Sequence, residues 1–152
     1  VKKLFNKYKN ARNKYEIINI TPASVHNDIV KEYKKCKIKP ECKEMKELFG
    51  WHGSRLDNIQ QICKTGFNPK LCKTHEHGKG TYFDIRVDKA CDFSLRNKDG
   101  NRYVLLCKIL GCKCIQGNKT FNGNEHPCFV NYKSPKRTTI YCITKKNHSI
   151  PW

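Results

Sequence analysis

Apolar residues at helical spacing predict two helices in the first half of the chain. The first runs from Ser24 to Cys36 and has one apolar face. That face is formed by Val25, Ile29, Val30 and Tyr33. The second begins near Leu56, and Gly66 stands where it should end, because glycine readily adopts the backbone conformation that terminates helices. Ser54-x-x-Asp57 is a candidate cap for its start.

Runs of apolar and β-branched residues predict four strands. They cover residues 15–20, 81–83, 103–110 and 138–144. The first stops before Pro22, and the third is apolar on both faces, which is typical of a central strand. A short helix is expected over residues 88–94. The strands outnumber the helices, and the helices cluster early, so the fold class is α+β.

Three segments have the composition of turns and loops. They are residues 36–47, 68–79 and 116–126. A disulfide between Cys36 and Cys42 would staple the first. The second contains Cys72, His75 and His77, but their irregular spacing argues against a metal site. We therefore expect no metal.

Two short motifs carry the candidate chemistry. They are Trp51-His52-Gly53-Ser54-Arg55 and Gly78-Lys79-Gly80-Thr81-Tyr82-Phe83. A histidine beside a glycine, just before a helix, suits a binding site, since glycine lets a ligand approach the bare backbone. An isolated His-Gly pair is more often structural. Because the second motif follows the first along the chain, the two together favour a binding site over a structural role.

Together the motifs resemble those of the poly(ADP-ribose) polymerase-like ADP-ribosyltransferases. That family has a histidine in an HG[ST] strand end, a tyrosine in a GxGxYF strand and a variable third residue on a later strand. The resemblance extends from about Tyr15 to the end of the chain. It implies a diphtheria-toxin-like fold of two packed, antiparallel-rich sheets with flanking helices, in a single domain over residues 1–152. NAD+ would lie in the cleft between the sheets. Ahead of the resemblance, residues 1–14 are basic and polar, which is typical of a lead-in.

The resemblance also assigns roles to individual residues. His52 would hydrogen-bond the adenosine ribose of NAD+, and the backbone of Gly53 would hold the nicotinamide amide, with Ser54 completing the motif. Tyr82 would stack on the nicotinamide ring. Phe93, about eleven residues later, would be the second stacking aromatic, since flat aromatic faces suit a flat pyridinium. For both aromatics, the alternative is a place in the core.

The third position falls on Ile140 when the last strand is aligned with the family. Polymerising members have a glutamate there, and isoleucine cannot accept a hydrogen bond. A His-Tyr-Ile triad is similar to that of members that transfer single ADP-ribose units, so we expect no chain elongation. Glu125 is a candidate substitute acid.

A second departure is Ala90, where the family usually has a serine that bonds the nicotinamide amide. Ser94 could replace that contact. One missing neutral hydrogen bond typically costs ~0.5–1.5 kcal/mol, which weakens binding without abolishing it.

The chemistry needs few ionisable groups. Breaking the bond between nicotinamide and ribose passes through an oxocarbenium-like state, as glycoside cleavage does. Positioning and electrostatics supply most of the catalysis. This agrees with a sequence that lacks an obvious acid/base pair.

The net charge and the cysteine content of the chain bear on its partners and its cellular compartment. The net charge of +18 on 152 residues favours polyanionic partners, although scattered lysines also make an ordinary soluble surface. Ten cysteines and three glycosylation sequons slightly favour secretion with several disulfides. The alternative is reduced core cysteines in the nucleus or cytoplasm. No apolar run is long enough to span a bilayer. The chain starts at Val1, as an excised domain or a processed chain would.

Our interpretation is a monomeric mono-ADP-ribosyltransferase, a pentosyl-transferring glycosyltransferase that moves ADP-ribose from NAD+ to a protein or nucleic-acid acceptor. One alternative is an inactive module of the same fold that binds ADP-ribose or RNA. Ala90 and Ile140 favour it, whereas His52 and Tyr82 count against it. Another alternative is a secreted, disulfide-stapled cationic effector.

Overall fold

The computed structural model describes residues 1–8, 15–40, 46–72, 77–111, 115–116, 128–132 and 138–152. The helices are α1 (Lys2–Tyr8), α2 (Asn27–Lys37), α3 (Leu56–Thr65) and α4 (Val87–Asp92), with 3-10 turns η2 (Pro69–Leu71) and η3 (Lys146–His148). The strands are β1 (Lys46–Gly53), β2 (Thr81–Asp84), β3 (Val104–Gly111), β4 (Ile115–Gln116), β5 (Cys128–Tyr132), β6 (Thr138–Ile143) and β7 (Ser149–Pro151). Helices and strands together confirm the α+β class.

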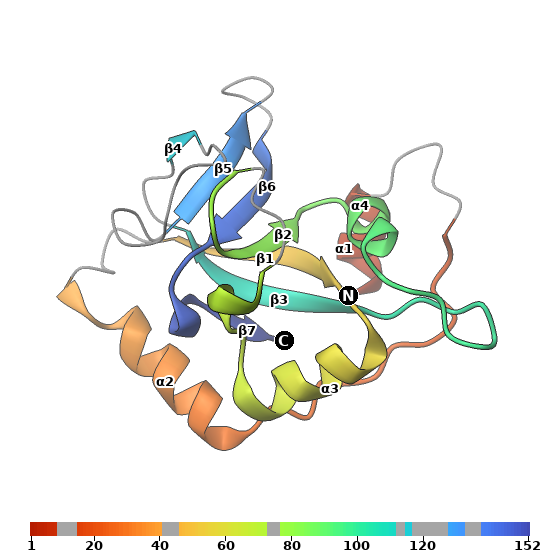
Figure 1. Ribbon diagram of the computed structural model, residues 1–152, viewed down its shortest axis with the longest axis horizontal. Coiled ribbons are helices and arrows are strands. Elements are labelled where there is room, and N and C mark those ends of the chain that lie inside the picture. Colours follow the sequence, from red (N-terminus) through yellow and green to blue (C-terminus); the bar gives the residue numbers. More distant parts are fainter. Residues whose placement is uncertain (9–14, 41–45, 73–76, 112–114, 117–127, 133–137) are drawn as a thin grey trace.

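The described strands form one sheet in the order β4-β5-β6-β2-β1-β3-β7. All neighbours are antiparallel except β4 and β5. The expectation of two packed sheets is wrong, because the short strand β2 pairs with β1 on one side and with β6 on the other. The two halves therefore join edge to edge. In Figure 1 the β5–β6 pair stands away from β1 and β3, with β2 between them.

The core lies on both faces of β1 and β3. One cluster holds Phe67, Phe83, Leu105, Cys107, Ile109 and Ile143, with α3 packed against it. A second holds Phe5, Trp51, Val87, Ala90, Cys91 and Leu106, and so joins α1 and α4 to the sheet. A third joins α2 to β3 and β7. Because β3 contributes to all three clusters and pairs on both edges, the prediction of a central, doubly buried strand is confirmed.

The helix predictions hold with shifted starts. The first helix begins at Asn27 rather than Ser24, with His26 as its N-cap. The second ends as predicted, because Gly66 has φ 78° and its N–H bonds the carbonyl of Ile62. The expected cap from Ser54 is wrong: the N-cap is Arg55, which makes no side-chain cap bond, while the Ser54 hydroxyl accepts a bond from Asn58.

One strand prediction and one turn prediction need correction. Residues 15–20 are extended but form no strand, because Tyr15 and Ile17 lie on the face of the sheet, against the Trp51 cluster, where they cannot pair with a strand edge. The turn predicted up to Glu47 is replaced by the start of β1 at Lys46. The strand predicted over 138–144 is confirmed as β6, but β7 follows it. Within the described residues, no helix is long and apolar enough to cross a membrane.

Candidate functional site

His52 is tied to the neighbouring strand by its side chain. Its Nδ1 lies 2.9 Å from the carbonyl oxygen of Tyr82. A carbonyl only accepts hydrogen bonds, so Nδ1 carries the proton. Burial lowers the pKa of His52 below its ordinary value, which keeps the ring neutral at pH 7. The other ring nitrogen, Nε2, is then an acceptor suited to a hydroxyl group.

Aromatic rings hold the imidazole from the core side. The centroid of the His52 ring lies 5.1 Å from that of Phe67, edge to face, and 5.6 Å from that of Phe83. Phe67 follows α3 directly and is 2% exposed, so the helix and its glycine stop place this contact. The orientation of the imidazole is therefore fixed by packing as well as by the bond to β2.

Gly53 allows α4 to approach β1 closely. A Cβ atom at this position would overlap the carbonyl oxygen of Ala90 and lie 3.3 Å from the backbone nitrogen of Ser94. No larger residue fits without displacing the helix. The glycine of the motif thus has a structural reason of its own, beside the exposure of backbone that a ligand could use.

The hydroxyl of Tyr82 is anchored to the main chain of the preceding loop. It donates to the carbonyl of Gly78 at 2.5 Å and accepts from the N–H of His77 at 3.0 Å. Burial raises the pKa of Tyr82, so the phenol stays protonated. The hydroxyl is therefore a fixed anchor for the ring rather than a proton-transfer group, which agrees with a stacking role.

Strand pairing places Ile140 on the same face of the sheet as Tyr82. In the β2–β6 ladder, Tyr82 lies opposite Cys142, and Asp84 lies opposite Ile140. Residues directly opposite each other in a ladder share a face, and so do residues two apart on one strand. Tyr82, Asp84 and Ile140 therefore lie on one face. Glu125, the candidate substitute acid, lies outside the described residues.

The other predicted residues occupy different surroundings. Phe93 follows α4 and is 73% exposed, so its ring is accessible rather than part of the core. Ala90 is 3% exposed and belongs to the Trp51 cluster. The Ser94 hydroxyl is fully buried and accepts the N–H of Tyr103 at 3.0 Å. This structural bond argues against Ser94 as the replacement for a serine at position 90.

Asp84 is the residue of this region that sequence reasoning missed. Its side chain is buried, it directly follows the Gly78–Phe83 motif, and the Arg86 backbone N–H bonds it at 2.8 Å. Burial raises the pKa of Asp84, and the Arg86 bonds and charge oppose that rise. The signal available in the sequence was a charged residue directly after an apolar strand.

The sequence predicts several disulfides and no metal site. Among the described residues, no group of three or more His, Cys, Asp or Glu side chains is arranged to hold a metal ion. His75 lies outside the described residues. The expectation of disulfides is wrong for Cys63, Cys91, Cys107 and Cys142, which are free thiols. The expected Cys36–Cys42 bridge involves Cys42, which also lies outside them.

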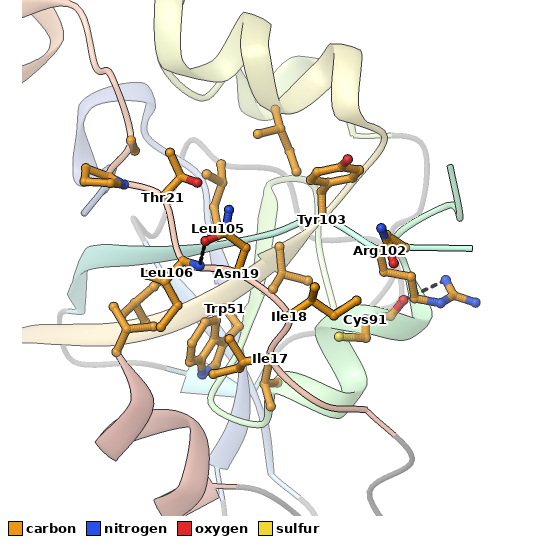
Figure 2. Close-up of a pocket in the computed structure, with 18 of the residues that line it drawn as sticks. Ile17, Ile18, Asn19, Thr21, Trp51, Cys91, Arg102, Tyr103, Leu105 and Leu106 are labelled. Atoms are coloured by element: carbon orange, nitrogen blue, oxygen red, sulfur yellow. Dashed lines mark hydrogen bonds between the residues drawn. The ribbon is translucent and has the colours of Figure 1, made fainter. Parts of the chain in front are cut away.

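A large cavity lies apart from these residues. Its volume is about 1370 Å³, and it is roofed by the extended segment 15–26 over Trp51 and Leu106. Figure 2 shows Ile17 and Ile18 on one side, with Arg102 and Tyr103 at one end. His52, Tyr82 and the other predicted site residues do not line it. The cavity is therefore distinct from the candidate site.

Comparison with known proteins places this arrangement in a family. The chain belongs to the family described as the poly(ADP-ribose) polymerase catalytic domain, whose model matches residues 1–150. Members are typically NAD+-dependent ADP-ribosyltransferases, and these domains use NAD+ as a substrate. The family resemblance drawn from the two motifs is confirmed at this level.

Individual relatives match only part of the chain. "Protein mono-ADP-ribosyltransferase PARP16" of Homo sapiens is 34% identical over 68 residues, which are 45% of this chain and 21% of that protein. The Mus musculus protein of the same name matches equally. "Poly [ADP-ribose] polymerase tankyrase" of Caenorhabditis elegans is 29% identical over 76 residues, 47% of this chain and 3% of that protein. The matches thus span a small part of these longer proteins.

The fold is shared more completely. The crystal structure of the PARP domain of Arabidopsis RADICAL-INDUCED CELL DEATH1 superposes with a TM-score of 0.80. The superposition covers 99% of this chain and 91% of that one, at 16% sequence identity. At this identity the likeness establishes the fold alone.

Proposed function

We propose that the chain is a mono-ADP-ribosyltransferase that transfers ADP-ribose from NAD+ to a protein or nucleic-acid acceptor and releases nicotinamide. The observation that carries the proposal is the bond from His52 Nδ1 to the Tyr82 carbonyl. It leaves a neutral, oriented Nε2 as the acceptor for a ribose hydroxyl, which matches the family's use of this histidine.

The nicotinamide end of NAD+ would meet the remaining motif residues. The backbone of Gly53 would hold the carboxamide, beside the partly exposed Ser54. The anchored ring of Tyr82 would stack on the pyridinium, and the exposed Phe93 would close on it from the end of α4. Aromatic faces attract cationic rings, so this arrangement favours the bound, charged form of nicotinamide.

The reaction breaks the bond between the ribose C1′ and the nicotinamide nitrogen. Nicotinamide leaves with the electron pair, and the acceptor forms a bond to C1′ as it loses its proton. The residues of the site contribute by holding the ribose and the leaving group in fixed geometry. The net charge of +18 favours approach of the anionic dinucleotide.

Transfer of single units is supported by Ile140. It shares a face with Tyr82 at the position where polymerising relatives have an acid. An aliphatic side chain offers no hydrogen bond to a ribose hydroxyl of a growing chain. The basic surface, including the exposed Lys34 and Lys35 of α2, suits an acidic protein or nucleic acid as acceptor. We expect the protein to act as a monomer.

A second candidate function is binding without catalysis. The Ser94 hydroxyl is committed to Tyr103, and Ala90 is buried in the core, so the amide contact usual in the family has no evident donor among these residues. An ADP-ribose- or RNA-binding module would tolerate this loss. The secreted cationic effector loses its disulfide argument at four of the ten cysteines, Cys63, Cys91, Cys107 and Cys142, which are free thiols.

The test is incubation with labelled NAD+ in a mixture of proteins, RNA and DNA, with His52→Ala as control. Label transferred as single units, and lost in the control, is the expected result. Long polymer would contradict the role given to Ile140. If neither transfer nor nicotinamide release occurs, the catalytic proposal is wrong, and direct titration with ADP-ribose then tests the binding module.

A further inference from the structure

Asp84 ends β2 at the point where three strands meet. It pairs with Trp51 of β1 on one side and with Ile140 of β6 on the other. The residue is only 7% exposed. A carboxylate this far from water requires compensation, and buried carboxylates with perturbed pKa values are concentrated at functional sites.

The compensation comes from one neighbouring residue. The backbone N–H of Arg86 donates to Oδ1 at 2.8 Å, and the Arg86 guanidinium lies 3.4 Å from each carboxylate oxygen, through Nε to Oδ1 and Nη2 to Oδ2. Asp88, at the start of α4, is the nearby like charge. The short backbone bond is made to Oδ1, and the long contact at Oδ2 leaves that oxygen with capacity to accept a further hydrogen bond.

Asp84 lies directly opposite Ile140 in the β2–β6 ladder, beside the position where the resembled polymerising members have a glutamate. Residues directly opposite each other in an antiparallel ladder have Cβ atoms roughly 4.5–5.5 Å apart and point to the same side. The Asp84 carboxylate therefore lies next to the Ile140 side chain, on the face that carries Tyr82. An acid lost from β6 can thus be supplied from β2 without any change in the backbone.

We propose that Asp84 is the acid of this site, and that its carboxylate accepts a hydrogen bond from a hydroxyl of the nicotinamide-side ribose. This inference rests on the proposed transferase function. As the bond from C1′ to the nicotinamide nitrogen breaks, positive charge develops on the ribose, and the nearby carboxylate stabilises it. The carboxylate itself is unchanged at the end of the step, because the acceptor releases its proton to solvent.

The competing explanation is a purely structural ion pair with Arg86, and thermal stability separates the two. Burial raises the pKa of Asp84, so the ionised carboxylate is less favourable in the folded protein than in water at pH 7. Asp84→Asn removes that charge and keeps the size, so a functional acid predicts an unchanged or higher melting temperature. An ion pair that stabilises the fold predicts a lower one.

The experiment compares the wild type with Asp84→Asn, the double variant Asp84→Asn/Ile140→Glu and the surface control Asp57→Asn, whose side chain is 79% exposed. Nicotinamide release, single-unit transfer, NAD+ affinity and melting temperature are measured for each. We expect Asp84→Asn to lower kcat by ~100-fold or more, as loss of one electrostatic stabiliser does, with NAD+ affinity within about threefold. Adding Ile140→Glu should restore at least about tenfold, because it returns a carboxylate to the same face.

The outcomes separate this inference from the function on which it rests. An active wild type with an equally active Asp84→Asn variant overturns the role of Asp84 and leaves the transferase function standing. Loss of activity together with a lower melting temperature, and without recovery in the double variant, also overturns it. A wild type that neither binds nor cleaves NAD+ overturns the proposed function itself.

Discussion

His52 and Tyr82 are joined directly, because the imidazole Nδ1 of one lies 2.9 Å from the main-chain carbonyl of the other. β1 and β2 otherwise meet at the pair of Trp51 and Asp84, where the two halves of the sheet join. The bond from His52 is a second link across this junction. It fixes the tautomer of the histidine and, through the backbone, the position of the Tyr82 ring.

Because of this link, we expect the variant His52→Asn to keep its stability while losing affinity for NAD+. An asparagine amide can donate to the Tyr82 carbonyl as Nδ1 does, but it has no group at the position of Nε2. We expect the melting temperature to stay close to that of the wild type. NAD+ affinity should fall by about 2- to 10-fold, since one hydrogen bond to an uncharged group is worth ~0.5–1.5 kcal/mol. Calorimetric titration measures this, and unchanged affinity would mean that His52 does not contact the ligand.

The lowered pKa of His52 predicts a pH dependence of stability. Below the ordinary value of 6.5 the unfolded chain takes up a proton that the folded protein resists. The contribution of this residue to the free energy of unfolding therefore falls as pH decreases through 6.5, by about 1.4 kcal/mol per pH unit at most. Above that value both states are neutral and the effect vanishes. Denaturant titrations of the wild type and His52→Asn between pH 5 and 8 should diverge only on the acid side; parallel curves would show that the ring is not held neutral.

Tyr82→Phe keeps the ring and removes both bonds to the main chain of Gly78 and His77. At ~0.5–1.5 kcal/mol for each bond, we expect a loss of ~1–3 kcal/mol in the free energy of unfolding. KM for NAD+ should rise because the ring is less well held, while kcat changes little. Tyr82→Ala, which also removes the stacking surface, should reduce kcat/KM much further. Equal kcat losses in the two variants would indicate that the hydroxyl takes part in the chemistry.

Gly53→Ala tests the close approach of α4 to β1. The added methyl group would overlap the Ala90 carbonyl, so the helix must move. Overpacking of this kind typically costs ~1–3 kcal/mol. The neighbouring Ser54→Ala is the matched control, since the bond of the Ser54 side chain within the described residues goes to the exposed Asn58 amide. A Gly53→Ala protein as stable as the control would show that α4 is loosely placed.

The sequence predicted the elements whose signals are local. Gly66 ends α3 because a single residue provides the required backbone conformation, and β3 is buried on both sides because all its residues except Lys108 are apolar or glycine. The His52 and Tyr82 motifs identified the family for the same reason. Secondary-structure prediction failed where contacts with other segments of the chain determine the structure. Glu47 stands in a charged segment whose composition predicts a turn, but it belongs to β1, where its carboxylate accepts hydrogen bonds from Tyr33 and Lys37 of α2.

Long-range pairing could not be derived from alternation. Residues 15–20 have the pattern of a strand, yet this pattern does not distinguish pairing at a sheet edge from lying across a face. The single sheet forms because β2 pairs with a strand on each side, and the four residues of β2 carry no sequence signal that predicts this double pairing. Asp84 gained meaning only from its register with Ile140. The two motifs of the site were therefore predictable from the sequence, whereas Asp84 became a candidate only once the strand pairing was known.

The buried cysteines predict a pattern of thiol reactivity. Cys107 and Cys142 are fully buried, and Cys91 is 6% exposed. Burial raises the pKa of Cys91 to about 11 and that of Cys142 to about 12, so neither forms the reactive thiolate at neutral pH. In the folded protein these three should resist iodoacetamide, whereas the partly buried Cys63 should react sooner.

Denaturation without reductant gives the decisive comparison for these thiols. All four residues should then be alkylated, as peptide mass spectrometry would show, because their thiols are free in the fold. Failure of Cys91, Cys107 or Cys142 to react until a reductant is added would mean that it forms a disulfide. Full alkylation would instead remove the disulfide argument for an oxidising compartment at these positions, and the cysteines would then act as small apolar residues of the core.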